Sequence, residues 1–318
     1  MGSVPINGTA SIPETNDMLI PQFSTPVEWP VPASSSQVAW ASEDRVLVEA
    51  GGKLRMHNRA GRHLFDLRPS GALVPSVGGA VMRQGGRLRT VGPDGTLRNL
   101  GAQKLSGRVL QVLPKSRLVL LAVDRRDAHT DVILQDFSGR RLFAVPRRHG
   151  SVWDAAFEPY LGSSGHLVIG ARDHGQAHLK SGLSVYEWTK SRLERLWDPV
   201  DLPEPPDEVG GVFPPTPTRF ATAGSVLSFG VRRKAGFEAA FAAERRPHHN
   251  LDFWRGYLGP ASLARTELVV RRVGLNFDDP VNLATFPGRT PPTSVALSPS
   301  RRHAALLFDG RVAVVAIR

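Results

Sequence analysis

From about residue 37 onward, the chain alternates short hydrophobic runs of β type with polar turns. The first segment contains four such runs, each long enough for one strand: Gln37–Ala41, Arg45–Glu49, Lys53–His57 and Arg62–Leu67. Four runs recur in the segments Leu73–Leu100 and Arg108–Val145. Short runs of this kind bounded by polar turns are typical of strands. The pattern therefore predicts an all-β structure built from a repeated four-stranded unit of roughly 30 to 40 residues.

The turns between the third and fourth predicted strands also repeat. Asn58–Phe65 and Asp136–Phe143 share the sequence Gly-Arg-x-Leu-Phe, and Gly92–Leu97 holds the same place in the unit between them. A tight hairpin turn needs a residue that tolerates positive φ, and glycine does so without steric cost. One such glycine per unit favours a true repeat over three unrelated hairpins: Gly61, Gly95 and Gly139.

Two further units follow, and the last of them is incomplete. Val152–Trp197 contains four runs, whereas Ser294–Ile317 contains three. In a closed ring the missing strand can come from the other end of the chain, where Met18–Ile20 and Val27–Trp29 are short apolar runs. Closure removes exposed sheet edges. We therefore predict that a strand near the N-terminus completes the last unit.

The region 203–292 breaks this rhythm. It begins with proline-rich stretches, and Gly236–Arg246 has the strongest helix pattern in the chain because Ala, Glu and Arg favour helices. Phe237 and Phe241 would lie on one face of that helix. One interpretation is a single unit with an insertion at about residues 232–264, for six units in all. Two irregular units here would give seven.

The repeat resembles the WD-repeat-like β-propeller superfamily over Gln37–Arg318. The resemblance rests on the period, the turn glycines and phrases such as Ser294–Pro299 before a strand, and divergent bacterial propellers are similar. The Gly-His and Trp-Asp dipeptides of true WD repeats do not recur. The resemblance implies one β-propeller of six, alternatively seven, four-stranded blades, closed by an N-terminal strand and carrying one helical insertion. Residues 1–35 would be an extended arm and residues 36–318 the propeller.

Composition removes several classes of protein. The 318 residues include no cysteine, which excludes a disulfide scaffold, an iron–sulfur centre and a thiol nucleophile. No apolar run reaches the roughly 18 residues of a membrane helix. The first 36 residues lack the positive region and apolar core of a targeting signal. We expect a cytoplasmic protein without membrane contact.

Charge indicates the kind of partner. The formal net charge is +11, yet the first 35 residues contain no Lys or Arg, and the arginines recur as dispersed pairs beside apolar runs. Nucleic-acid binding requires clustered rather than dispersed positive charge. An acidic protein is therefore the expected partner, and nucleic acid is the weaker alternative.

The familiar catalytic motifs are missing from the sequence. No phosphate-binding loop, His-Glu-x-x-His or Gly-x-Ser-x-Gly occurs. Two loop groups contain residue types that bind zinc, although nothing enforces their geometry: His174 and His178, and His248, His249 and Asp252. A polar loop explains both groups more simply, so we expect neither metal nor cofactor.

One aromatic segment has the composition of a protein interface. Within the predicted insertion, Phe253, Trp254, Arg255 and Tyr257 lie close together, and Arg232 and Arg233 precede the insertion. Trp, Tyr and Arg often anchor interfaces, although these aromatics could merely seat the insertion on the propeller. We predict a non-catalytic propeller scaffold for protein–protein interaction. The alternatives are a hydrolase- or lyase-type propeller enzyme with its site in the central channel or loop face, and a nucleic-acid-binding propeller.

Overall fold

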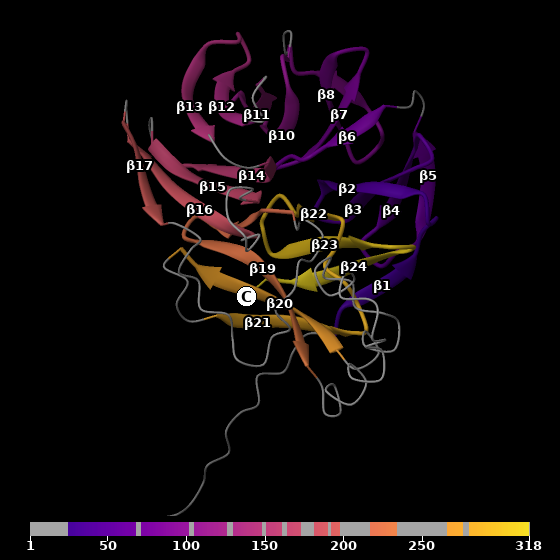
Figure 1. The fold of residues 1–318 in the computed structure, drawn as a ribbon. Coiled ribbons are helices and arrows are strands. Elements are labelled where there is room, and N and C mark those ends of the chain that lie inside the picture. Colours follow the sequence, from indigo (N-terminus) through magenta and orange to yellow (C-terminus); the bar gives the residue numbers. More distant parts are fainter. Residues whose placement is uncertain are drawn as a thin grey trace, which may run out of the picture.

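A computed structural model describes the chain in segments. These are residues 25–67, 71–101, 105–125, 130–147, 151–160, 164–172, 181–189, 192–197, 217–233, 266–275 and 280–317. They contain twenty-four strands, arranged in six antiparallel sheets of four strands each. The six sheets stand around a common centre as the blades of a β-propeller (Figure 1). The propeller thus has six blades, and the alternative of seven does not apply.

Each blade starts at the centre and runs outward. Blades 1 to 3 follow in chain order: β2 (Ser35–Ser42), β3 (Arg45–Ala50), β4 (Lys53–Asn58) and β5 (His63–Leu67); β6 (Ala72–Val74), β7 (Ala80–Gln84), β8 (Arg87–Val91) and β9 (Leu97–Asn99); β10 (Arg108–Leu113), β11 (Leu118–Asp124), β12 (Thr130–Asp136) and β13 (Arg141–Arg147). The sequence predicted these three units with boundaries shifted by only a few residues.

Blades 4 and 5 contain the long interruptions of the sequence. Their strands are β14 (Ser151–Pro159), β15 (Ser164–Arg172), β16 (Ser181–Thr189) and β17 (Arg192–Trp197); β18 (Phe220–Thr222), β19 (Ser225–Arg233), β20 (Thr266–Gly274) and β21 (Val281–Pro287). Region 203–292 therefore supplies one blade, and its two middle strands are joined by residues 234–265. The predicted helix at 236–246 lies outside the described residues.

Blade 6 joins the two ends of the chain. Its strands, from the centre outward, are β22 (Ser294–Leu297), β23 (His303–Phe308), β24 (Arg311–Ala316) and β1 (Val27–Pro30). β1 pairs antiparallel with β24, from Val27 opposite Val314 to Pro30 opposite Arg311. The predicted closing strand is thus confirmed, and it is the second of the two candidate runs. Met18–Ile20 lies outside the described residues.

The core is divided among the contacts between blades. Six clusters of buried apolar residues occur in the described part of the chain, and each combines side chains from two neighbouring blades. Between blades 3 and 4, for example, the rings of Phe143, Phe157 and Trp188 lie 5.6 to 5.9 Å apart. Because every blade contributes to two clusters, the hydrophobic stabilisation depends on an unbroken ring.

The closing strand contacts the first blade through one tryptophan. Trp29 of β1 is 5% exposed, and its ring stacks on His57 with the ring centroids 6.2 Å apart. It also covers Gly61, where an added Cβ would lie 2.5 Å from Cγ of Trp29. Glycine is therefore needed at position 61 for two reasons: a side chain would collide with Trp29, and the backbone has a φ of 87°. Gly95 and Gly139 have φ values of 84° and 89°, as the repeated turn predicts.

The propeller has two different faces. We call the face at which the inner strands β2, β6, β10, β14, β18 and β22 begin the cavity face, and the face at which they end the turn face. On the turn face, successive strands are joined by only two to six residues. On the cavity face the joining segments include residues 198–219 and 234–265. None of the described residues forms a helix of the length and apolarity that crossing a membrane requires.

Candidate functional site: the mouth of the central channel

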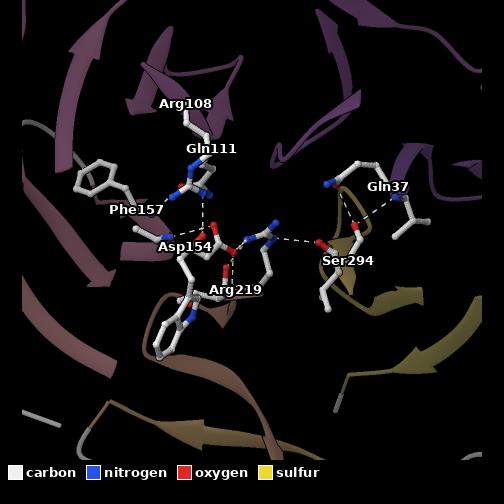
Figure 2. Close-up of polar contacts among 12 residues, drawn as sticks. Gln37, Arg108, Gln111, Asp154, Phe157, Arg219 and Ser294 are labelled. Carbon is white, nitrogen blue, oxygen red and sulfur yellow. Dashed lines mark hydrogen bonds and ion pairs between the residues drawn. The ribbon is translucent and has the colours of Figure 1, made fainter. Parts of the chain in front are cut away.

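A cavity of about 380 Å³ opens where the inner strands begin. All six inner strands, or the residues just before them, contribute to it, together with β7 of blade 2. The side chains of Gln37, Arg108, Asp154 and Arg219, which line it, lie around the centre of the ring (Figure 2). The lining side chains with charged or amide groups are Gln37, Arg83, Arg108, Asp154 and Arg219.

A buried ion pair joins blades 4 and 5 beside this cavity. Asp154 of β14 and Arg219, just before β18, are 9% and 4% exposed, and Oδ2 of Asp154 lies 2.6 Å from Nη1 of Arg219. The same oxygen accepts a hydrogen bond from the backbone N–H of Thr218 at 2.8 Å, and Oδ1 accepts one from Ala155 at 2.9 Å. Each charge is thus paired and hydrogen-bonded, as burial requires.

The same arginine extends the connection to blade 6. Nε of Arg219 donates a hydrogen bond of 3.0 Å to the carbonyl oxygen of Val295 in β22. The Arg219 side chain therefore joins the segment that leads into β18 of blade 5 to the inner strands of blades 4 and 6. Its planar guanidinium suits this position because its donors point in fixed directions.

Polar side chains make the other junctions nearby. Between blades 3 and 4, Arg108 donates hydrogen bonds to the carbonyl oxygens of Trp153 and Val152, at 2.8 and 2.6 Å. Between blades 6 and 1, the hydroxyl of Ser294 donates to Oε1 of Gln37 at 3.0 Å and accepts from the N–H of Val38 at 3.2 Å. These contacts hold the cavity walls at fixed separations.

A glycine on the neighbouring strand makes room for Trp153. Trp153 lines the cavity and is partly buried. A Cβ at Gly170 of β15 would collide with the indole Nε1 of Trp153. That nitrogen and Oγ1 of Thr218 are buried without a hydrogen-bond partner in the described structure. Gly170 thus sets the position of one cavity wall.

At the turn face, an ion pair crosses the ring. Nη2 of Arg301, in the turn after β22, lies 2.5 Å from Oε2 of Glu158 at the end of β14. These residues belong to blades 6 and 4, which are not neighbours. In the same turn, Ser300 donates from its hydroxyl to Glu43 of blade 1 at 2.8 Å. Burial raises the pKa of Glu43, but hydrogen bonds from Ser300 outweigh this effect and hold the pKa below its ordinary value.

The hydroxyl groups of the cavity are already hydrogen-bonded within the protein. The hydroxyl groups of Ser294 and Thr293 are hydrogen-bonded to Gln37 and to the carbonyl of Leu307. Neither hydroxyl is paired with a general base, which an activated nucleophile requires. Among the described residues, no group of three or more His, Asp or Glu side chains is placed to hold a metal ion.

Only some of the site residues predicted from the sequence lie in the described part of the chain. Arg232 and Arg233 form the end of β19, where they pair with Glu267 and Thr266 of β20. The other predicted partner-binding or metal-binding residues lie outside the described part of the chain: Phe253, Trp254, Arg255, Tyr257, His174, His178, His248, His249 and Asp252. Of the residues named from the sequence, the described part of the chain thus places only Arg232 and Arg233, and the other assignments stay predictions.

The sequence did contain a sign of the channel site. In β14, Asp154 interrupts an otherwise apolar stretch, Val152–Phe157, that the repeat assigns to an inner strand. A carboxylate at such a position is costly unless it is paired. The pattern therefore demands a cation, but Arg219 is far away in the sequence, and only the blade arrangement identifies it.

Comparisons with known proteins agree only at the level of the fold. No protein-family model matches the sequence, and no curated protein matches it. Among solved structures, the tricorn protease has a TM-score of 0.46 and 9% identity, over 92% of this chain and 34% of that chain, so this chain spans about a third of it. A putative TolB from Agrobacterium tumefaciens has a TM-score of 0.42 and 11% identity, over 91% and 92% of the two chains. A chain of the mitotic checkpoint complex has a TM-score of 0.42 and 11% identity, over 89% and 77%. At these values the similarities carry no information about function.

Proposed function

We propose that the protein is a non-catalytic propeller scaffold that binds a protein partner on its cavity face. The observation that supports this proposal is the asymmetry of the two faces. In blade 4, Ser151, Arg172 and Ser181 lie side by side in the sheet, so residues 173–180 are joined to the cavity face. The paired residues Arg233 and Thr266 place the ends of residues 234–265 there as well. Long connections on a rigid scaffold are the usual carriers of recognition.

Charge supports an acidic partner. Arg83, Arg108 and Arg219 line the cavity, and Asp154 is the only acidic side chain among the described residues that does so. Arg232 and Arg233 end β19 at the same face. Complementary charge mainly accelerates encounter and is screened by salt. We expect partner binding to weaken as ionic strength rises. A cysteine-free chain suits a reducing compartment, and we propose that it works in the cytoplasm.

The aromatic segment provides the sharpest test. The double variant Trp254→Ala/Tyr257→Ala should lose its partner in affinity purification with mass spectrometry from the native cell. Val281→Ala, which shortens an exposed side chain on the outer strand β21, is the matched control and should keep the partner. An unchanged set of bound proteins in the double variant would overturn the assignment of this segment as the interface.

A second variant separates folding from binding. Residues 236–262 can be replaced by a short Gly-Asn turn, which preserves the whole of β19 and β20 and their pairing from Ser225 opposite Gly274 to Arg233 opposite Thr266. We expect the shortened protein to melt cooperatively, which shows that it folds, but to lose the partner. Retention of the partner would assign binding to another part of the molecule.

A further inference from the structure

We propose that the channel cavity binds the carboxylate group of a monoanionic ligand with an apolar body. This proposal does not depend on the protein partner proposed above, because it concerns a small site formed by described side chains. It rests on three observations: the hydrogen-bonding groups that remain available in the cavity, its excess positive charge, and its apolar walls.

The side-chain acceptors of the cavity are already engaged. Both carboxylate oxygens of Asp154 accept hydrogen bonds, from Ala155, Thr218 and Arg219. Oε1 of Gln37 accepts from Ser294, whose own oxygen accepts from the N–H of Val38. A ligand that mainly donates hydrogen bonds therefore finds few side-chain acceptors here. The cavity selects for a ligand that accepts them.

Donors, by contrast, remain available. The guanidinium of Arg83 makes no hydrogen bond or ion pair with any described residue, and it is exposed at the cavity wall. Arg219 uses Nε and Nη1, which leaves Nη2, and Gln37 keeps its amide nitrogen. A free guanidinium is a planar fork that matches the two oxygens of a carboxylate.

The charge of the cavity favours an anionic ligand. Three arginines and one aspartate line it, and Arg219 is already paired with Asp154. Among the described residues, Arg108 donates only to neutral carbonyl groups, and neither its charge nor that of Arg83 has an acidic partner. The free guanidinium fork of Arg83 matches the two oxygens of one carboxylate, whereas the apolar lining offers few donors to the further oxygens of a phosphate.

The apolar walls of the cavity favour a ligand whose part beyond the carboxylate is apolar. Leu73, Val74, Val109 and Pro217 border the cavity together with the ring of Trp153. A volume of about 380 Å³ is within the range of small-molecule sites. An aliphatic acid or the C-terminal carboxylate of a peptide with an apolar last residue has the required chemistry, and the two sources can be distinguished by experiment.

Isothermal titration calorimetry on the full chain tests the proposal. The probes are N-acetyl-leucine for a peptide end, 4-methylpentanoate for a free acid, the uncharged N-acetyl-leucinamide, and inorganic phosphate. We expect at least one of the two acids to bind with a Kd below about 1 mM, and the amide and phosphate to bind at least about tenfold more weakly. Tighter binding of one acid identifies the source. No binding of either acid, or equal binding of the amide or of phosphate, would overturn the proposal.

Two variants locate the site. Arg83→Gln removes the uncommitted guanidinium and should weaken binding of the acid at least about tenfold. Arg98→Gln removes the same charge from β9 of the same blade, outside the cavity, and should bind as the original protein does. Gln37→Glu keeps an oxygen for Ser294 but adds a negative charge, and should abolish binding with the fold intact by circular dichroism. Unchanged affinity in Arg83→Gln and Gln37→Glu would place the ligand elsewhere and contradict the proposal.

Discussion

The cavity face and the turn face are built from the same strands but serve different purposes. On the turn face the connections are short, and in the turns between β4 and β5 and between β12 and β13 the side chains of Asn58 and Asp136 accept backbone hydrogen bonds. On the cavity face the connections vary widely in length, and the polar groups surround an open space. The regular connections thus lie on the turn face, where they specify the fold. The connections of variable length lie on the cavity face, where a ligand can reach the cavity.

The ion pairs on the two faces join different sets of blades. Asp154 and Arg219 connect neighbouring blades and form the wall of the cavity. Arg301 and Glu158 connect blades that are not neighbours, across the turn face. The channel therefore has a ligand-accessible mouth at one end and a bridge between its walls at the other.

The largest expected effect comes from breaking the cavity-face ion pair. Asp154→Ala or Arg219→Met alone should lower the free energy of unfolding by about 3–5 kcal/mol, because each leaves a buried charge without its partner. Urea denaturation measures this loss. Glu194→Gln, which breaks the exposed pair with Arg192, is the control and should change it by less than about 1 kcal/mol. The double variant should lose less than the two single losses added together; full additivity would contradict the coupling described here.

Substitutions at two glycines on the turn face distinguish the free-energy cost of backbone strain from the cost of a steric clash. Gly61 and Gly139 have nearly the same φ, but only Gly61 lies under Trp29. Gly139→Ala should cost about 1–2 kcal/mol for the left-handed backbone alone. Gly61→Ala should cost at least about 1 kcal/mol more, because Trp29 must move and the closing strand moves with it. Equal losses by thermal or urea denaturation would mean that Trp29 adjusts freely.

Two arginines test whether the bridge across the turn face is important. Arg117 and Arg301 occupy equivalent turns and have φ values of 55° and 61°. Arg117→Gly relieves this strain and loses mainly a cation–π contact with Phe137, at 5.6 Å, so stability should change by less than about 1 kcal/mol. Arg301→Gly relieves the same strain but leaves Glu158 unpaired, and should destabilise by about 1–3 kcal/mol. Similar values for both variants would show that the bridge contributes nothing.

The smallest effect is a pH dependence that belongs to the turn face. His57, His166 and His303 lie near strand ends on that face, and burial lowers the pKa of each. Below pH about 6.5 the unfolded chain therefore binds more protons than the folded one, and stability falls as pH falls. We expect a lower Tm at pH 5.5 than at pH 7.5, and a smaller difference in His57→Gln.

Three carboxylates with lowered pKa values do not contribute to the change in Tm between pH 7.5 and 5.5. Hydrogen bonds from His63, Thr96 and Ser138 hold the pKa values of Asp66, Asp94 and Asp136 below their ordinary values, so these groups stay ionised over the same pH range. A Tm that is constant from pH 7.5 to 5.5 would contradict the assignment to buried histidines.

Most of the fold follows from local signals in the sequence. A glycine such as Gly139 marks a turn, and alternating runs mark the strands around it, because both depend on neighbours within a few residues. The closing strand was also predictable, since three runs in the last unit leave one place vacant. Val27–Pro30 could not be chosen over Met18–Ile20, because the choice depends on how Trp29 packs against blade 1.

The candidate site was much less predictable. Arg83 and Gln37 are ordinary polar residues in their own strands, and they become neighbours of one cavity only when six blades close into a ring. The partner of Asp154 lies 65 residues away in the sequence. Periodicity assigns a residue to an inner strand, but it does not specify which residues of other blades it faces.

The pairing of β1 with β24 has a mechanical consequence. Val27, where β1 begins, is opposite Val314, near the end of β24, so the two chain segments leave the blade side by side. A force that pulls these segments apart acts on one pair of residues at a time, beginning with that pair. The strands would therefore separate like a zipper rather than slide past each other. A ring held together by six blade interfaces would thus open under a small load applied where β1 pairs with β24.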